Sequence, residues 1–412
     1  MSNFASSVRR MVKRMSVPGA PTRRVVVIGG GNAGLSIAGR LQRRRGLEVT
    51  VIEPRTSHVY APLQSHIAGG AARASEAERP QAQATPKGVA WVRGSVTAVD
   101  AERNAVTLAS GETIGYDDLI VAAGIEQHWD AVPGLSAAMA DERGISNYTL
   151  PLAAKASLAL RDLTSGTVVF AQCPEPASAA GVAQKPMYLA AEWWRAKGVA
   201  GDIRIVFVSP EPSASANPAV SAELQRKLDE YGIETHFSFD LLDVDAARRE
   251  VTIGRGIHRE SISYDLLHAA PPQRPAVWIA EGGLADADGF VDVDPQTLRH
   301  RRYSNVWALG DAAAVRTRRS GGAIRKQAQT LAKNHADALA GRRLSAVYDG
   351  YTVTPVTVSR RTVVFAEFDG DDRLQPTVPF WKTLYRERRL TWIFDRHILP
   401  QVYWHLILRG LA

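Results

Sequence analysis

Three glycines near the start of the chain have the spacing of a nucleotide-binding turn. Gly29, Gly31 and Gly34 form the pattern G-x-G-x-x-G between an apolar segment and a segment with helical spacing. In such a turn the first glycine permits a tight bend, the second lets the backbone approach a pyrophosphate, and the third lets helix and strand pack closely. The free N–H groups and the dipole of a helix start also favour phosphate, so the pattern predicts a dinucleotide.

A second set of residues, late in the chain, suits a flavin. Gly310 and Asp311 end a predicted strand over residues 303–311. The acid can accept hydrogen bonds from ribityl hydroxyls, and the glycine lets the chain pass close to the cofactor. An ordinary turn is the alternative for this pair alone. The next helix is predicted to begin after Arg319, where its positive end would stabilise negative charge on a reduced flavin. Its first turn has the small residues Gly321, Gly322 and Ala323, followed by Ile324.

Cysteine chemistry is restricted because the chain has a single cysteine, Cys173. This excludes an internal disulfide, a C-x-x-C redox pair and a cysteine-based zinc site. The 412 residues are enough for two or three domains, and 45% hydrophobic and 22% charged residues are typical of a globular enzyme. No apolar run reaches the ~18 residues that span a bilayer.

The elements around the glycines predict a nucleotide-binding unit. Residues 25–28 are apolar and β-branched, as in a strand buried on both faces of a parallel sheet. After the helix, a second strand over residues 47–52 ends in Glu53, where a carboxylate can bind ribose hydroxyls. A chance glycine turn is the alternative, but strands, glycines and acid occur in register. A later strand over residues 116–124 ends in small residues at Gly124, which would let its backbone lie beside the cofactor.

A second α/β unit begins near residue 151 and repeats this order of elements. Its strand-to-helix turn, however, contains Pro174, Pro176 and only one glycine, Gly181. Prolines remove N–H donors that a pyrophosphate needs. We therefore expect no ordinary NAD(P) site in this unit, which makes a nicotinamide-dependent reductase the weaker interpretation.

Both ends of the chain are basic, and the formal net charge is +8. Residues 1–23 form a basic arm for which three interpretations stay open: a disordered arm, contact with anionic lipid, or an organelle presequence. From Phe380 onward, aromatic and basic residues interleave. That pattern suits either a bilayer interface or terminal helices packed on the core. No base-reading fold accompanies it, so we expect no nucleic acid partner.

The chain resembles the sulfide:quinone oxidoreductase family of mitochondria and many bacteria, over nearly everything after the N-terminal arm. The stretches that carry the resemblance include GGGNAG at 29–34, EPRTSHVYAP at 53–62, AQKPMYLAAEWW at 183–194, GFVDVDPQTLRHRRYSNVWALGD at 289–311 and LPQVYWHLILRG at 399–410. The resemblance implies an α/β fold with two Rossmann-like dinucleotide-binding domains, the two-dinucleotide-binding flavoprotein fold, and a C-terminal amphipathic helical region. The expected parts are the arm (1–23), a discontinuous FAD-binding domain (24–150 and 290–345), the second domain (151–289) and a C-terminal membrane and quinone region (346–412).

The resemblance also implies specific contacts and partners. FAD would be bound by the first unit, and a pair of C-terminal amphipathic helices would place the protein on a membrane surface and guide a quinone to the flavin. The FAD contacts implied in this way are Gly31, Asn32, Ala33, Glu53, Val96, Asp311 and residues 321–324. Ala61 stands where the family usually has a glutamine near the cofactor.

The sequence departs from the family at its redox cysteines. The two positions, in the AAGVAQK and GYTVTP segments, are Ala179 and Thr354. Neither side chain forms a persulfide or a disulfide. Cys173 lies nearby in sequence, and we interpret it as an inert thiol rather than a displaced nucleophile. His58, His66 and Lys185 lie in segments near the expected flavin, and we interpret them as structural hydrogen-bonding groups.

The sequence thus predicts an FAD-dependent oxidoreductase that transfers electrons from an unidentified small-molecule donor to a quinone, without the usual sulfide chemistry. A non-catalytic flavin-binding relative is the first alternative, and an NAD(P)H:quinone reductase is the second. The expected location is peripheral to a membrane. This would be the cytoplasmic face in a bacterium, or the mitochondrial inner membrane if the arm is a presequence.

Overall fold

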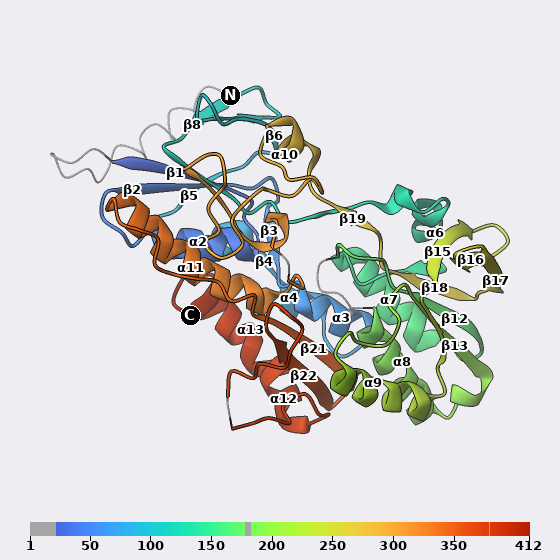
Figure 1. The fold of residues 1–412 in the computed structure, drawn as a ribbon. Helices are drawn as coiled ribbons and strands as arrows, with labels where there is room; N and C mark the ends of the chain where they lie inside the picture. Colours follow the sequence, from blue (N-terminus) through green and yellow to red (C-terminus); the bar gives the residue numbers. More distant parts are fainter. Residues whose placement is uncertain (1–21, 178–182, 316, 379) are drawn as a thin grey trace.

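The computed structural model describes residues 22–177, 183–315, 317–378 and 380–412. Nearly all of the predicted basic arm, the glycine of the second turn (Gly181) and the first cysteine position (Ala179) lie outside these ranges. Figure 1 shows the two α/β units side by side, with the C-terminal region against both.

The first unit is built on a parallel five-stranded sheet of order β20-β9-β1-β2-β5. The predicted first two strands are β1 (Arg23–Ile28) and β2 (Leu47–Ile52), and Val25, Val27 and Val51 are fully buried between helices and sheet. The remaining strands are β5 (Ala90–Val92), β9 (Asp118–Val121) and β20 (Val306–Ala308). Because β20 pairs with β9, the late Gly-Asp strand end lies next to the early glycine turn.

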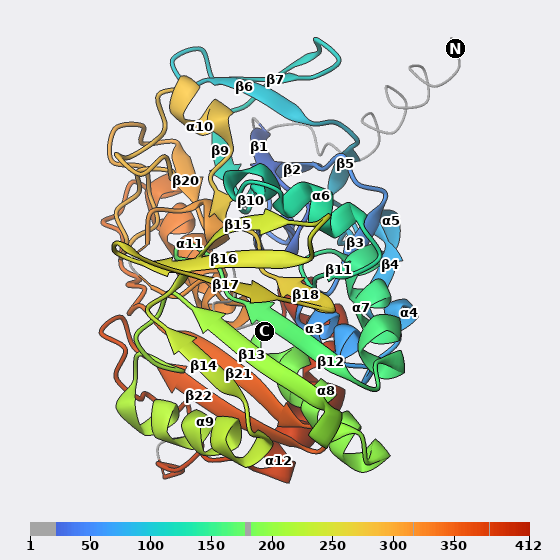
Figure 2. The same ribbon diagram turned by 90° about the vertical axis from the view of Figure 1, so that its right-hand side faces the viewer.

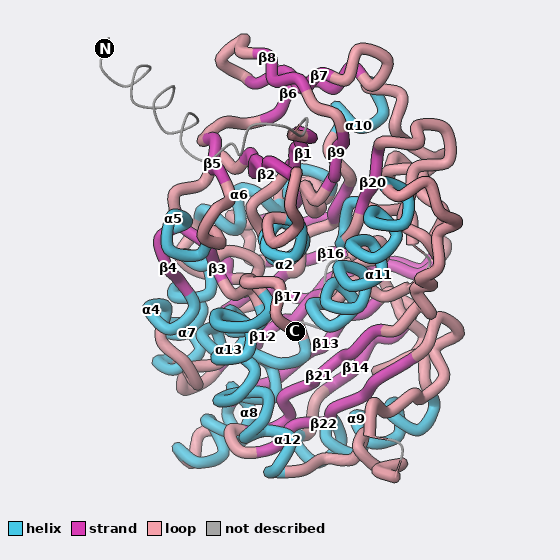
Figure 3. The backbone as a smooth tube through the Cα atoms, turned by 90° about the vertical axis from the view of Figure 1, so that its left-hand side faces the viewer, coloured by secondary structure: helices cyan, strands magenta, loops and turns pink. Residues whose placement is uncertain are grey.

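Two helices cover this sheet, α2 (Asn32–Leu41) and α11 (Gly321–Leu339), and they pack on one another (Figure 3). Several short elements lie outside the main sheet of this unit. They comprise β3 (Ser57–Val59), α3 (Pro62–Ala68), α4 (Ala74–Ala77), β4 (Glu78–Pro80), α5 (Gln81–Ala84), the antiparallel sheet β6 (Val96–Asp100), β7 (Ala105–Leu108) and β8 (Thr113–Gly115), and α10 (Val277–Glu281).

The second unit repeats the architecture with a parallel sheet of order β11-β18-β12-β13-β14. Its first strand, β11 (Gly144–Ile145), precedes residue 151, at which we expected the unit to begin. The chain passes between the two units twice. These two connections pair as a short antiparallel ladder of β10 (Glu126–Gln127) with β19 (Gln273–Arg274). The other elements are α6 (Leu135–Ala140), α7 (Leu150–Asp162), β12 (Gly166–Ala171), α8 (Gln184–Lys197), β13 (Ile203–Ser209), α9 (Pro218–Tyr231), β14 (Glu234–Phe237), β15 (Asp240–Asp245), β16 (Glu250–Arg255), β17 (His258–Ser263) and β18 (Leu266–Ala269).

The C-terminal region consists of a hairpin and a helical run. The hairpin strands β21 (Thr352–Ser359) and β22 (Thr362–Phe368) pack on α8 and α9, as Figure 2 shows beneath the second sheet. The expected pair of amphipathic helices is one continuous run: α12 (Arg389–Ile393), the π-helical η4 (Phe394–Ile398), α13 (Leu399–Val402) and the π-helical η5 (Tyr403–Ile407). Pro400 falls inside the run without ending it, because the wider π turns precede and follow its helical segment. Across the described residues, none of the helices combines the length and apolar character needed to cross a membrane.

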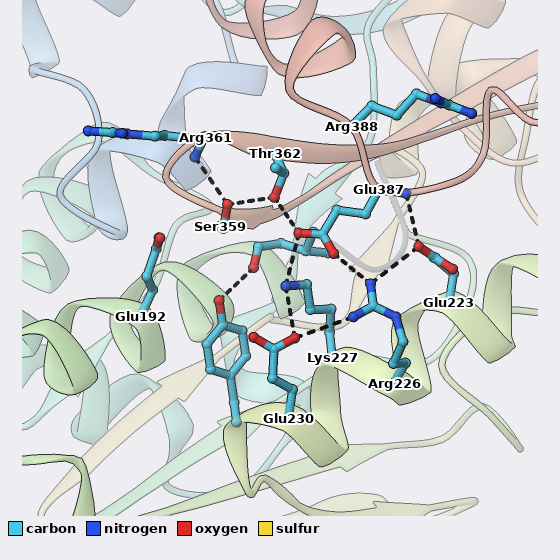
Figure 4. A network of polar contacts seen from close by, with 12 residues as sticks. Glu192, Glu223, Arg226, Lys227, Glu230, Ser359, Arg361, Thr362, Glu387 and Arg388 are labelled. Atoms are coloured by element: carbon cyan, nitrogen blue, oxygen red, sulfur yellow. Dashed lines mark hydrogen bonds and ion pairs between the residues drawn. The ribbon is translucent and has the colours of Figure 1, made fainter.

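A network of charges attaches α9 to the segment before this helical run (Figure 4). Arg226 Nη2 and Lys227 Nζ lie 2.6 Å and 2.9 Å from the two carboxylate oxygens of Glu387. The Thr362 hydroxyl donates to the same carboxylate at 2.6 Å, and Glu223 accepts the Glu387 N–H at 3.0 Å. Burial by itself would raise the pKa of Glu387, but the hydrogen bonds that it accepts outweigh burial and lower that pKa. The network therefore stabilises the contact only while Glu387 is ionised.

Candidate functional site

A cavity of about 1400 Å³ lies where the first unit, the second unit and the C-terminal region meet. One end is formed by the glycine-rich turn, the end of β9 and the start of α11. The predicted site residues that line it are Gly29, Gly31, Asn32, Ala33, Glu53, Gly124, Asp311, Gly321, Gly322 and Ile324. Segments from the beginning and the end of the first unit thus meet on one cavity.

The other predicted residues lie behind or away from the lining. A Cβ atom at Gly34 would lie 1.8 Å from the Gly29 carbonyl oxygen, so this glycine permits the close approach of helix and strand. A Cβ added at Gly310 would lie 2.9 Å from the Cβ of Ala33, so this glycine also permits close packing. Ala323 is buried in the first turn of α11. Val96 lies in the separate sheet of β6 and is not part of the lining.

The glycine turn leaves space where a cofactor backbone needs it. Gly29 has a φ of +100°, which favours glycine. Gly31 has an ordinary φ of −76°, and a Cβ added there would meet only the Arg55 guanidinium, at 3.9 Å. A Cβ at Gly124 would meet nothing within 4 Å. Both glycines face the cavity with open space beside them, so the turn fits a bound pyrophosphate.

Glu53 is a buried carboxylate at the end of β2, with 2% of the residue exposed. Its Oε2 accepts the Gly30 N–H at 2.8 Å, and Arg55 Nε donates to its Oε1 at 2.8 Å. Burial would raise the pKa of Glu53, but the Arg55 guanidinium and the backbone N–H groups outweigh it and lower that pKa. Glu53 is therefore an ionised acceptor fixed at the position where a ribose is expected.

The start of α11 reaches the cavity beside Asp311. Ser320 caps the helix by accepting the Ala323 N–H at 3.1 Å. Gly321 and Gly322 line the cavity, and the first N–H groups of a helix have no partners within the helix. Together with the positive end of the 19-residue helix, this edge can stabilise negative charge on a ring placed against it.

The opposite end of the cavity is apolar and is made by the C-terminal region. Its lining includes Val353, Phe365, Trp381, Leu384, Leu390, Ile393, Phe394, Ile398, Leu399 and Val402. Thr354, the second cysteine position of the resemblance, lies on this lining in β21. The site therefore joins a polar, glycine-lined end to an apolar end wide enough for a hydrophobic ring.

Cys173 lies outside this lining. It is 5% exposed, in a small cluster with Ala177, Ala270 and Tyr148. Burial raises the pKa of the thiol to about 12, so it stays protonated at neutral pH. This environment favours the interpretation of Cys173 as an inert thiol.

His58, His66 and Lys185, which we expected to be structural hydrogen-bonding groups, have different surroundings in the structure. His58 binds the Gly30 carbonyl through Nδ1 at 3.0 Å and the Tyr403 hydroxyl through Nε2 at 2.5 Å, and it connects the turn to the tail. His66 Nε2 binds the Thr357 hydroxyl at 3.1 Å. Lys185 and His58 line the cavity, whereas His66 lies behind the lining.

Sequence reasoning missed Asp395, which is buried and lines the cavity beside the apolar residues. A signal was present, since Asp395 is the single acid among the aromatic and apolar residues after Glu387. A carboxylate at such a position is costly to bury and is a candidate functional group.

The start of α8, in the second unit, is closed where a second dinucleotide would bind. Gln184, Lys185 and Pro186 in its first turn are all buried. The Gln172 side chain accepts the Ala183 N–H at 3.4 Å, and Gln184 donates to the Ala214 carbonyl at 3.1 Å. These contacts occupy polar groups at the start of α8 that a phosphate would otherwise bind.

Comparisons with known proteins identify the family. Residues 23–334 match the model of the family described as pyridine nucleotide-disulphide oxidoreductase. The mitochondrial sulfide:quinone oxidoreductase of Dictyostelium discoideum is 31% identical over 94% of this chain and 86% of its own length. The sulfide:quinone oxidoreductase structure from Aquifex aeolicus has a TM-score of 0.80 at 18% identity, covering 95% of this chain and 92% of that one.

A chain in the cryo-EM structure of the Tetrahymena thermophila mitochondrial ATP synthase has a TM-score of 0.81 at 19% identity, covering 97% of this chain and 99% of that one. At these identities the two structures show the fold alone, and they confirm the expected arrangement of two dinucleotide-binding units. From the family model and the relative in Dictyostelium, the chain belongs to the pyridine nucleotide-disulphide oxidoreductases and, within them, to the FAD-dependent sulfide:quinone oxidoreductase family.

Proposed function

We propose that this chain transfers two electrons from a small-molecule donor to a quinone at a membrane surface, without a cysteine-based sulfide cycle. The observation that carries the proposal is the single cavity that joins the glycine-lined end to the apolar end. The first end has the form of a flavin site and the second has the hydrophobic character of a quinone site. Electron transfer between the two ligands then needs no large movement of the chain.

The residues of the polar end fit FAD, which supplies reversible two-electron chemistry when bound. Gly31 would bring its backbone to the pyrophosphate, and the ionised Glu53 would accept the ribose hydroxyls. Asp311 would accept ribityl hydroxyls. The start of α11 at Gly321 would stabilise charge at the N1 and O2 edge of the ring.

The donor would not pass through a persulfide on a cysteine pair. Thr354 occupies the second cysteine position on the lining, and a threonine side chain forms neither a disulfide nor a persulfide. Ala179, at the first position, lies outside the described residues. Cys173 is buried with its pKa raised to about 12, so it would not supply a thiolate.

The C-terminal run would provide the membrane contact next to the apolar end. Phe380 is 88% exposed, Leu390 59% and Ile398 45%, and arginines flank them at 386, 388 and 389. Exposed apolar side chains beside basic ones suit an anionic bilayer interface. We place the protein peripherally on a membrane, at the cytoplasmic face in a bacterium or at the mitochondrial inner membrane if the N-terminal arm is a presequence.

The test uses the flavin absorbance of the purified holoprotein. After anaerobic photoreduction, addition of ubiquinone or menaquinone analogues should restore the oxidised spectrum at catalytic rates. Mixing the oxidised protein with sulfide should give neither fast bleaching nor a thiolate–flavin charge-transfer band. Failure of every quinone to reoxidise the reduced flavin would contradict the proposal, and a charge-transfer band with sulfide would contradict the loss of the cysteine route.

A non-catalytic, flavin-binding role is the second candidate, favoured by Thr354 at a position where the family reacts. It predicts a photoreduced flavin that oxygen reoxidises and quinones do not. An NAD(P)H:quinone reductase is disfavoured by the closed start of α8, and bleaching of the flavin by NADH within seconds would revive it.

A further inference from the structure

We propose that Asp395, paired with Lys185 and adjoining His66, is the proton-donating site for the quinone bound at the apolar end of the cavity. This inference rests on the proposed function and adds to it the source of one proton. Asp395 and Lys185 would be catalytic residues, and His66 a positioning residue.

Three elements distant in sequence bring these side chains together. Asp395 lies in η4 of the C-terminal run, Lys185 in the first turn of α8 and His66 in α3. Their residues are 6%, 6% and 2% exposed. Asp395 and Lys185 line the cavity, and Asp395 Oδ2 lies 3.7 Å from His66 Nε2. The cluster therefore faces the ligand space from within the core.

Asp395 has unused hydrogen-bonding capacity. Within the part of the chain that the structure describes, its buried Oδ2 makes no hydrogen bond. A buried carboxyl oxygen without a partner is unfavourable unless a ligand or a proton satisfies it. Its neighbours on the same helical run, Ile393, Phe394 and Ile398, all line the apolar end. A polar atom of a ring bound there is the partner that the site lacks.

The other titratable groups around Asp395 either bind elsewhere or are neutral. Arg396, the next residue, donates instead to Glu76 at 2.7 Å and to the Ala71 carbonyl at 3.2 Å. Tyr60 faces the cluster as a neutral phenol, because burial and the nearby Asp395 raise its pKa well above the ordinary value. Burial lowers the pKa of His66 to about 3, so the imidazole is neutral. Lys185 and Arg396 are the cations that lower the pKa of Asp395, and of the two Lys185 lines the cavity.

Asp395 and Lys185 line the same cavity, and in the proposed mechanism they share one proton. Burial raises the pKa of Asp395, and Lys185 opposes this shift. Burial lowers the pKa of Lys185, and Asp395 opposes that shift. The two forms, a neutral acid with a neutral amine and an ion pair, contain the same number of protons. A coupled pair of this kind titrates as a unit.

Quinone reduction needs such a donor because it takes up two electrons and two protons. FAD, when bound and reduced, would supply both electrons and one of these protons. The second proton moves from the Asp395–Lys185 pair to a quinone oxygen, forming one O–H bond there and breaking one O–H or N–H bond in the pair. The pair is left as a carboxylate with a neutral amine, and a proton from solvent restores it.

The test follows reoxidation of photoreduced holoprotein by ubiquinone-1 in stopped flow, across pH 5 to 9, for the wild type and Asp395→Asn. We expect the substitution to slow reoxidation by about 100-fold and to abolish its pH dependence, the magnitude being that of a lost general acid. Lys185→Met should behave similarly and serves if the first variant does not fold. Asp371→Asn, at an exposed acid, is the matched control and should equal the wild type.

A second readout does not depend on turnover. The infrared difference spectrum on binding of a non-reducible quinone analogue should contain a protonated carboxyl band that Asp395→Asn removes and Asp371→Asn retains. Wild-type rates and pH profile in Asp395→Asn, or a carboxyl band that persists in it, would overturn the inference and leave the proposed function standing. Failure of quinones to reoxidise the wild type would overturn both.

Discussion

Gly31 and Gly34 are three residues apart in one motif, yet their replacement by alanine should affect different properties. Gly31→Ala should weaken FAD binding, and Gly34→Ala should lower the stability of the fold. A Cβ at Gly34 would lie 1.8 Å from the Gly29 carbonyl oxygen, which belongs to the backbone and has no freedom to move aside. A Cβ at Gly31 would meet only the end of the Arg55 side chain, at 3.9 Å, and would lie at the cavity where we propose that the pyrophosphate binds. Gly31 also has a φ of −76°, which alanine adopts without strain.

The expected magnitudes follow from these contacts. Gly34→Ala overpacks the interface of α2 with β1 and should lower the free energy of unfolding of the apoprotein by about 1–3 kcal/mol or more. Gly31→Ala should leave that free energy within about 0.5 kcal/mol of the wild type, because it removes no contact. If the added methyl group displaces the pyrophosphate at a similar penalty of about 1–3 kcal/mol, the Kd for FAD rises by about 5-fold to 150-fold.

The assay combines urea unfolding of the apoproteins with titration of FAD by fluorescence quenching. Gly201→Ala is the matched control, since a Cβ there meets nothing within 4 Å, its φ is not positive and it lies outside the cavity lining. Wild-type affinity for FAD in Gly31→Ala would refute the assignment of the cradle. Unchanged stability in Gly34→Ala would refute the packing argument.

Two further predictions concern the C-terminal region. Glu387→Gln should lower the free energy of unfolding by about 1.5–3 kcal/mol at neutral pH, because the buried Lys227 loses one of its two charged acceptors and keeps Glu230. As the folded-state pKa of Glu387 lies below its ordinary 4.5, this stabilisation is present above that value and is lost as pH falls through the folded pKa. The difference between the variants in urea unfolding should therefore be largest at pH 7 and should shrink as the pH falls into the acid range. Combined replacement of Leu390 and Ile398 by serine should weaken binding to anionic vesicles by at least about 10-fold in flotation assays, because both side chains are exposed and apolar. Leu158→Ser is the control, since Leu158 on α7 is exposed to a similar extent. Equal flotation of all forms would contradict the membrane contact.

Truncation before Phe380 would be a poorer test of membrane binding. The helical run buries Tyr403, Trp404 and Leu408 in the main core, and its end packs on α2, where a Cβ at Gly39 would lie 2.7 Å from the backbone of Arg409. Removing the run would therefore unfold part of the cavity as well as the exposed face. Point substitutions at Leu390 and Ile398 leave Tyr403, Trp404 and Leu408 packed in the core.

The sequence by itself determined the two α/β units, predicted a role for each glycine in the first turn, and indicated that prolines remove N–H donors from the second. These features depend on short-range properties of the chain. A missing Cβ, a missing proline N–H or a β-branched run acts on neighbours within a few residues, so its consequence can be derived from spacing alone. The same local reasoning predicted Glu53 at the end of β2 and the helix start at Gly321.

The tertiary structure decided what spacing does not encode. It placed β11 in the second sheet, although it precedes residue 151, because strand pairing depends on which edges meet. It made the C-terminal run a wall of the cavity. It also brought Asp395 beside Lys185 and His66, where burial changes the proton affinity of each group. A pKa depends on the surroundings in space, and these come from elements that only the folded chain brings together.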